Sequence, residues 1–266
     1  MSKPVRLAIN GAAGRMGRTL LELLHDDDRF VVVAAIIPAG APRLGQVASP
    51  ADETLRFTAD AGESRPQVMI DFSGPAGLAA ALDYCQDHGV ALVSGTTGFD
   101  EALRARLALA ARRIPLMHES NFSLGVAVLT QLLREAAAAL PQWDLEIIEA
   151  HHGRKLDAPS GTARSLGEAA AAARGATLTR LAVQGARSGP REAGSIGFAV
   201  VRGGDIVGDH MAMLVGRGER LELGHRAGDR SIFARGAIEA AHWLATRAPG
   251  TYGLRDMLPV NPNSLK

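Results

Sequence analysis

The chain has 266 residues, of which 47% are hydrophobic and 21% charged, a composition typical of a globular protein with one large or two modest domains. Its formal charge of +1 reflects 29 basic against 28 acidic residues, and aromatic residues make up only 4%, so a nucleic-acid partner is not expected. The longest apolar run, Phe30–Ile37, is far shorter than the roughly 20 residues that span a bilayer, and the N-terminus lacks a signal-peptide pattern, so we expect a cytoplasmic protein that does not enter a membrane.

The first half of the sequence alternates apolar runs of strand length with helical stretches. The expected strands are Val5–Asn10, Phe30–Ile37, Val68–Phe72 and Val90–Ser94. The expected helices between and after them are Arg15–His25, Ala76–His88 and Glu101–Arg113. This alternation predicts an α/β fold, a Rossmann-type doubly wound parallel sheet with helices on both faces.

The pattern changes after Asn121. An apolar helix is expected at Leu124–Leu140 and a strand at Asp144–Ala150. Three later runs are separated by Gly-rich turns too short for a crossover helix: Ile196–Val201, His210–Val215 and Arg220–Ala227. They predict an inserted α+β domain built on a mixed or antiparallel sheet. A final amphipathic helix, Ser231–Thr246, returns the chain to the first domain, so we expect one domain of residues 1–123 plus 231–266 and a second of residues 124–230.

A glycine-rich loop joins the first expected strand to the first expected helix. Glycines there allow a tight turn and let backbone N–H groups approach a pyrophosphate at the positive end of the helix. The GxxGxxG spacing is only moderately specific, and a glycine-rich turn without a ligand is the alternative. Its position at the first strand–helix junction favours dinucleotide binding. The expected cofactor-binding residues are Gly11, Ala12, Gly14, Arg15, Met16 and Gly17.

The end of the second expected strand lacks the carboxylate that often binds the ribose 2′-hydroxyl of NAD. The chain continues as Ile36–Gly40, and the next acidic residue is Asp52. Without a carboxylate to repel a 2′-phosphate, we expect NADPH to serve at least as well as NADH. Arg15 and Arg43 are the nearest candidates to contact that phosphate.

The segment that follows the strand at Asp144–Ala150 concentrates polar chemistry. The strand delivers His151 and His152, and Lys155 follows in a loop. Pro159–Thr162 then opens an Ala-rich helix that runs to about Ala173, with natural N-cap hydroxyls and exposed N–H groups in its first turn. Together these groups predict a site for a carboxylate or phosphate beside side chains that can donate protons.

Less specific interpretations of this segment remain. Paired histidines can bind a metal, but neighbours on a strand point to opposite faces, no third ligand is evident, and the single cysteine, Cys85, excludes a multi-cysteine site, so no metal is expected. A lone lysine in a loop is usually solvated, and Ser-Gly-Thr before a helix is usually only a cap. The functional interpretation depends on all these features falling within twelve residues.

Six motifs, taken in this order, carry a resemblance that runs nearly the length of the chain. They are GAAGRMGR at Gly11–Arg18, DFSGP at Asp71–Pro75, SGTTGF at Ser94–Phe99, NFSLGV at Asn121–Val126, EAHHGRKLDAPSGTA at Glu149–Ala163 and GFAVVRGGDIVGDH at Gly197–His210. With them the chain resembles the dihydrodipicolinate reductase (4-hydroxy-tetrahydrodipicolinate reductase) family.

The resemblance implies an oxidoreductase of lysine and diaminopimelate biosynthesis. Such enzymes reduce 4-hydroxy-tetrahydrodipicolinate to tetrahydrodipicolinate with NADPH or NADH, by hydride transfer and protonation with loss of water. His151 is implied as the general acid, assisted by Lys155. The implied substrate-binding residues are His152, Lys155, Ser160, Gly161 and Thr162. Further implied cofactor contacts are Phe72, Gly95, Thr96, Thr97, Ser120, Asn121, Phe122 and Arg230.

The resemblance also implies a homotetramer in which the inserted domain binds substrate and shares its sheet among subunits. Two departures stand out: Ile37 and Pro38 lie where the family often has an acidic residue, sometimes followed by a basic one, and Glu119 lies where a small residue is common. A semialdehyde dehydrogenase working through a thioester would need a nucleophilic cysteine, and Cys85 lies in an expected helix. A non-catalytic NADPH sensor could discard His151, which this chain keeps.

Overall fold

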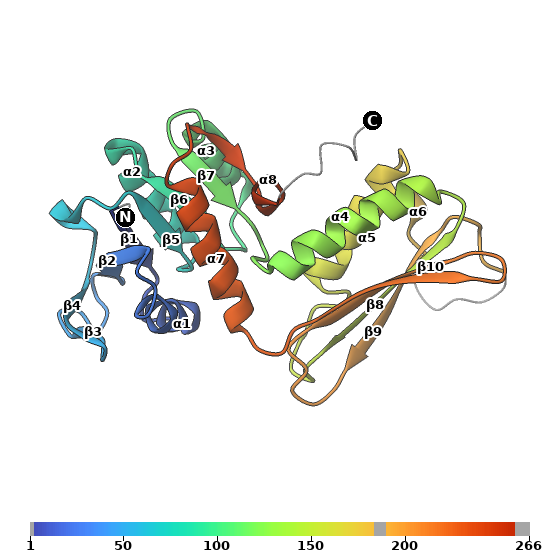
Figure 1. Cartoon of the computed structure of the whole chain (residues 1–266), viewed down its shortest axis with the longest axis horizontal. Helices are drawn as coiled ribbons and strands as arrows, with labels where there is room; N and C mark the ends of the chain where they lie inside the picture. Colours follow the sequence, from blue (N-terminus) through green and yellow to red (C-terminus); the bar gives the residue numbers. More distant parts are fainter. Residues whose placement is uncertain (1–2, 184–189, 259–266) are drawn as a thin grey trace. The chain divides into compact units, whose positions relative to one another are not determined.

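The computed structural model describes residues 3–183 and 190–258. The chain divides into two compact units. The first consists of Met1–Ser123 together with Ser231–Lys266, and the second of Leu124–Arg230 (Figure 1).

The first unit is built on a sheet whose strands follow the order β12-β7-β6-β5-β1-β2-β4-β3. All neighbouring strands pair in parallel except β3 and β4, which are antiparallel. The strand order runs outward in both directions from β1 and β5, which confirms the predicted Rossmann-type doubly wound sheet. The strands are β1 Val5–Asn10, β2 Phe30–Ile36, β3 Val47–Ser49, β4 Asp52–Thr58, β5 Val68–Asp71, β6 Ala91–Ser94, β7 Pro115–His118 and β12 Gly250–Tyr252.

Helices cover both faces of this sheet (Figure 1). Helices α2 and α3 share an apolar cluster with Ala8, Met69 and Leu92 of the sheet. Helices α1 and α7 contact each other, and α7 packs on β5, β6 and β7. Because side chains alternate along a strand, the fully buried Val68 and Ile70 point away from the side of Met69. The helical segments are α1 Arg15–Leu24, η1 Gly62–Ser64, α2 Pro75–His88, α3 Glu101–Ala110, α7 Ser231–Leu244 and α8 Leu254–Met257.

The second unit has a sheet of strand order β11-β10-β8-β9. Strands β8 and β9 are parallel and the other neighbours antiparallel, which confirms the predicted mixed sheet. Helices α4 and α5 pack against one face of it and share a core with Leu145, Ile147 and Leu214. The elements of this unit are α4 Leu124–Ala139, β8 Asp144–His151, α5 Gly161–Ala173, α6 Leu178–Leu181, β9 Ile196–Arg202, β10 Asp209–Val215 and β11 Arg220–Arg226.

The sequence analysis missed four strands of the first unit, β3, β4, β7 and β12. Strand β4 reads DETLRFT and buries only Phe57, so it carries no apolar run, and it is held by parallel pairing with β2. Strand β7 has four residues, beginning at a proline and with the first three buried, so it is too short to show a periodicity. The predicted elements are otherwise present, with ends that differ by a few residues.

Helix α7 passes directly against the backbone of the segment that leaves β7. A Cβ atom on Gly236 would lie 1.7 Å from the carbonyl oxygen of Phe122. We therefore expect Gly236→Ala to lower the free energy of unfolding by about 1–3 kcal/mol, because this overlap outweighs the gain of roughly 1 kcal/mol in helix propensity. Urea unfolding measures the change. Arg235→Ala, at an exposed neighbouring position, is the control, and an unchanged midpoint for Gly236→Ala would contradict the expectation.

Candidate functional site

The glycine loop after β1 packs tightly against its surroundings. A Cβ atom on Gly11, whose φ is +84°, would lie 2.6 Å from the carbonyl oxygen of Phe72, and one on Gly17 would lie 2.3 Å from that of Gly11. The loop is closed by a 3.0 Å hydrogen bond from the Gly14 nitrogen to the Gly11 oxygen. Gly14 is the N-cap of α1 and offers no side-chain cap. The loop thus combines backbone N–H groups not covered by side chains with the positive end of a helix, as a pyrophosphate site requires.

A single carboxylate ties together the loops at this edge of the sheet. Asp71 ends β5 and is fully buried. Its Oδ1 accepts hydrogen bonds from Asn10 Nδ2 at 2.8 Å and from the Ser73 hydroxyl. Its Oδ2 accepts from Ser94 Oγ and Thr96 Oγ1, both at 2.7 Å. The ends of β1, β5 and β6 are therefore held in register by one side chain, which the sequence analysis did not single out.

Other cofactor residues expected from the resemblance differ in exposure. A Cβ atom on Gly95 would overlap the Phe72 ring, 2.1 Å from its nearest atom, so these two residues pack in contact. Phe122 is 1% exposed and meets Phe72 edge to face, so its ring belongs to the core. Thr97 and Ser120 are exposed and line a common cavity of about 340 Å³.

No carboxylate follows β2 in the sequence, but one lies near the end of this strand in the fold. A cavity of about 350 Å³ is lined by Gly11, by Ile37 and Pro38, and by Asp60 from the segment that follows β4. Asp60 is exposed at its wall. The sequence analysis missed Asp60 because β4 was not recognised, so nothing placed its end beside the end of β2.

Glu119 has a structural role. Its Oε1 accepts a 3.1 Å hydrogen bond from the backbone nitrogen of Leu254, the first residue of α8. Burial raises the pKa of this carboxyl above its usual value. The residue that departs from the family pattern thus anchors the helix after β12.

In the second unit, His151 ends β8 on the face covered by the helices. Its Nδ1 donates to Glu149 Oε2 at 2.6 Å. Glu149 is fully buried and also accepts from both terminal nitrogens of Arg202, at 2.7 and 2.8 Å, and from the Ser160 nitrogen at 2.9 Å. A Cβ atom on Gly208 would lie 3.0 Å from His151 Nε2, so the absence of a side chain there leaves this nitrogen room.

The electrostatics of this cluster follow from burial and pairing. Burial opposes ionisation of Glu149, but hydrogen bonds from Arg202, His151 and the Ser160 nitrogen outweigh it and hold its pKa below the usual range. Burial, with His151 nearby, lowers the pKa of His210 to about 4, so this ring is neutral at physiological pH. The cluster thus contains a carboxylate, a guanidinium and an uncharged imidazole around His151.

The remaining residues of the segment lie in the same unit. Arg230 Nη2 donates to His152 Nε2 at 3.2 Å, and burial together with the nearby Arg154 and Arg230 lowers the pKa of His152. Arg230, expected as a cofactor contact, is thus placed beside His152. Lys155 Nζ pairs with Asp157 Oδ1 at 2.8 Å.

Helix α5 begins beside these groups. Ser160 is its N-cap and accepts a 3.2 Å hydrogen bond from the Ala163 nitrogen, while its hydroxyl also meets His210 Nε2 at 3.1 Å. Gly161 and Thr162 are the first two helical residues. The N-terminus of α5 and His210 therefore lie beside His151, and Lys155 lies in the loop that leads to this helix.

Two negative findings concern only residues 3–183 and 190–258. No group of three or more His, Cys, Asp or Glu side chains there could hold a metal ion, and no helix is long and apolar enough to cross a membrane. Cys85 is fully buried in α2, and this burial raises the pKa of its thiol, which opposes the thioester chemistry of a semialdehyde dehydrogenase.

Comparison with known proteins follows the division of the fold. Residues 5–122 match the family model described as dihydrodipicolinate reductase, N-terminus, and residues 125–258 match that of the C-terminus. The chain belongs to the dihydrodipicolinate reductase family. Within this family it is 48% identical over 262 residues to a 4-hydroxy-tetrahydrodipicolinate reductase of Thiobacillus denitrificans, covering 96% of this chain and 98% of that protein.

A second named reductase agrees with this assignment, and a solved structure agrees with the fold. A 4-hydroxy-tetrahydrodipicolinate reductase of Xanthomonas campestris is 49% identical over 259 residues, covering 97% of this chain and 99% of that protein. A solved structure of a dipicolinate-bound dihydrodipicolinate reductase from Paenisporosarcina sp. TG-14 has the same fold, with a TM-score of 0.79 at 23% identity over 96% of this chain and all of that one.

Proposed function

We propose that this family member reduces 4-hydroxy-tetrahydrodipicolinate to tetrahydrodipicolinate with NADPH or NADH, in the cytoplasm, as a step of lysine and diaminopimelate biosynthesis. The observation that carries the proposal is that His151 Nδ1 and the N-cap nitrogen of α5 bond the same carboxylate, with Lys155 five residues before that N-cap, in a chain 48% identical to a named reductase of this activity. The first unit would bind the dinucleotide, and the second the substrate.

The residues of the first unit fit a dinucleotide. Gly11 and Gly17 leave no side chain between the loop and the start of α1, and the 350 Å³ cavity adjoins that loop. The backbone from Gly11 to Gly17 would bind the pyrophosphate, with Arg15 and Met16 at the helix start. The segments Phe72, Gly95–Thr97 and Ser120–Phe122 would lie along the nicotinamide half. When bound, the cofactor supplies the hydride.

The residues of the second unit fit a cyclic dicarboxylate. Gly161 and Thr162 at the positive end of α5 would bind one carboxylate, and the Lys155 ammonium would add a full positive charge. Lys155 would exchange its partner Asp157 for the substrate, and His152 would donate or accept a further hydrogen bond. Ser160 supports this arrangement as the N-cap.

His151 is the proposed general acid. Its Nδ1 is occupied by Glu149, so Nε2 is the nitrogen available to protonate the carbon of the enamine that hydride addition leaves. Lys155 would stabilise the negative charge that develops as the hydride arrives. The 4-hydroxyl leaves as water before the hydride is transferred. General acid catalysis of this kind is typically worth ~10²–10⁴ in rate.

A direct assay tests the function. The condensation product of pyruvate and aspartate semialdehyde is mixed with the protein and NADPH or NADH, and absorbance at the nicotinamide band is followed. We expect oxidation of the cofactor that depends on the substrate. The absence of any oxidation by the wild-type chain would refute the proposal.

We propose further that NADPH serves at least as well as NADH, because Ile37 and Pro38 carry no charge to repel a 2′-phosphate. Asp60 is the one acidic side chain among the residues that line this cavity. Asp60→Asn should raise kcat/KM for NADPH about fivefold and that for NADH less, since removing a charge near 4 Å in water is worth about 1 kcal/mol. Initial rates with both cofactors measure this.

Asp52→Asn is the matched control, because Asp52 lies at the start of β4 and does not line the cavity. A wild-type kcat/KM far higher with NADH than with NADPH would contradict the proposed preference. If Asp60→Asn changed kcat/KM equally for both cofactors, Asp60 would not contact the 2′-phosphate.

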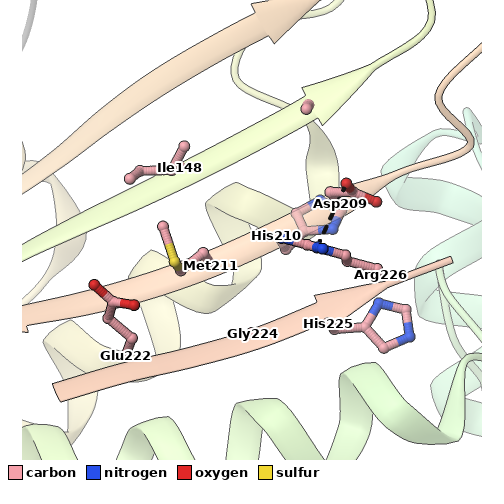
Figure 2. Close-up of a pocket in the computed structure, with 9 residues that line it drawn as sticks. Ile148, Asp209, His210, Met211, Glu222, Gly224, His225 and Arg226 are labelled. Atoms are coloured by element: carbon pink, nitrogen blue, oxygen red, sulfur yellow. Dashed lines mark ion pairs between the residues drawn. The ribbon is translucent and has the colours of Figure 1, made fainter.

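We also propose that the protein is a homotetramer assembled through the sheet of its second unit. The face of that sheet away from α4 and α5 has a pocket lined by Ile148 and Met211 with Glu222, and beside them an ion pair of 4.0 Å joins Asp209 and Arg226 (Figure 2). A face that combines apolar side chains with charges of both signs is suited to pairing with another copy. Light scattering in solution tests the subunit number.

A further inference from the structure

Glu149 is an acidic side chain with no exposed surface, and its carboxylate accepts hydrogen bonds from an imidazole, a backbone N–H and a guanidinium. His151 Nδ1 donates at 2.6 Å and the Ser160 nitrogen at 2.9 Å. Arg202 donates from both terminal nitrogens, at 2.7 and 2.8 Å, one to each carboxylate oxygen. These donors come from β8, from the N-cap of α5 and from β9, so three segments fix the orientation of the carboxylate.

The protonation of Glu149 constrains the ring of His151. The hydrogen bonds that hold the pKa of Glu149 below its usual range keep it ionised at neutral pH. An ionised carboxylate has no proton to donate, so the hydrogen between it and His151 must reside on Nδ1. In the neutral ring, Nε2 then carries a lone pair, and in the imidazolium it carries the proton that can be given away.

Arg202 extends this restraint to the loop that carries the lysine. Besides holding Glu149, its Nη2 donates to the backbone oxygen of Asp157 at 2.7 Å. The side chain of Asp157 in turn pairs with Lys155 Nζ at 2.8 Å. One guanidinium thus connects the carboxylate behind His151 with the loop that presents Lys155.

The surroundings of His151 Nε2, the nitrogen that does not contact Glu149, leave that nitrogen accessible. Gly208 leaves space at Nε2, where a Cβ atom would approach to 3.0 Å. The His210 ring meets that of His151 edge to face, with centroids 5.1 Å apart. Since His210 is neutral, it adds no charge against an imidazolium at His151.

We propose that Glu149, held by Arg202, is a positioning residue that fixes the Nδ1–H tautomer of His151 and directs its Nε2 to the substrate. This rests on the proposed function for the role of Nε2, but the tautomer itself does not depend on it. A merely structural ion pair between Glu149 and Arg202 would affect stability and leave the proton on the ring of His151 undetermined.

The test compares Glu149→Gln with the wild type in protein carrying ¹⁵N-labelled histidine. Ring ¹⁵N shifts at about pH 9, where ordinary imidazoles are neutral, identify the protonated nitrogen, and the signal of His151 is the one missing from His151→Gln. We expect Nδ1–H in the wild type and a shift toward Nε2–H in the variant, because the glutamine amide can donate to Nδ1. In the assay, kcat should fall by about 100-fold or more while KM changes less.

Glu146→Gln is the matched control, since Glu146 is a buried, ion-paired glutamate on the same strand, bonded to Arg191. It should change neither the tautomer nor kcat. Glu149→Asp keeps the charge and should retain more Nδ1–H than Glu149→Gln.

The wild-type spectrum alone can overturn the proposal, even if Glu149→Gln does not fold: an Nε2–H tautomer of His151 would do so. An unchanged tautomer and kcat in a folded Glu149→Gln would also do so. If the expected shifts are found but the wild type does not reduce the substrate, the proposed function fails and the control of the ring by Glu149 stands.

Discussion

Replacing His151 by glutamine is expected to lower kcat by roughly 10²–10⁴-fold, the loss typical of removing a general acid. Glutamine has a similar length and polarity, but it carries no titratable proton. Its amide can still hydrogen-bond to the Glu149 carboxylate, which keeps that buried charge partnered. The loss should therefore appear in the chemical step and leave the fold of the second unit intact. Steady-state kinetics with saturating cofactor measure it.

Cofactor affinity provides the internal control for His151→Gln. The glycine loop belongs to the first unit and His151 to the second, so the Kd for NADPH should change little. His25→Gln, at a solvent-exposed histidine, should keep the wild-type kcat. A near-normal kcat in His151→Gln would show that His151 is not the general acid.

Replacing Lys155 by alanine is expected to lower kcat about 10²–10³-fold and to raise KM. Lys155 precedes Ser160, the N-cap of α5, by five residues, and its ammonium pairs with Asp157. In the proposed mechanism, removing it takes away both a ligand for the substrate carboxylate and a charge that stabilises the developing anion, and single donors to such anions are worth about this factor. Kinetics at varied substrate concentration separate the two effects.

Asp157→Asn distinguishes the lysine from its ion pair. This variant breaks the pair but keeps the ammonium, so kcat should stay within a few-fold of the wild type. If Asp157→Asn lost as much activity as Lys155→Ala, the pair and not the free ammonium would be essential. A near-normal kcat in Lys155→Ala would refute its proposed role.

Glu149 gives His151 a buried partner that the sequence analysis did not identify. The alternation of β8 puts Glu149 and His151 on the same face as Leu145 and Ile147. The two-residue alternation of apolar side chains along this strand is visible in the sequence, and it could have identified Glu149 as a carboxylate that points into the core beside His151. Its partner Arg202 could not have been found in this way, because Arg202 lies 53 residues further along the chain.

The sequence by itself determined the fold class, the family and most of the proposed site. Alternating apolar runs fix strands and helices locally, and the loop Gly11–Gly17 and the segment His151–Thr162 place several functional groups within a few residues of one another. Groups so close in sequence stay close in space, so local reasoning was sufficient for them.

Only the tertiary structure decided which distant residues support those groups. Strands β4, β7 and β12 form because each pairs with the edge of a neighbouring strand. Their own residues show little of the apolar periodicity that predicts a strand. Asp71 holds three loops, and Asp60 reaches the cavity beside β2. In each case a polar group satisfies its hydrogen bonds or finds its site across the sheet, and such long-range partners follow from strand order and register, which no local sequence pattern encodes.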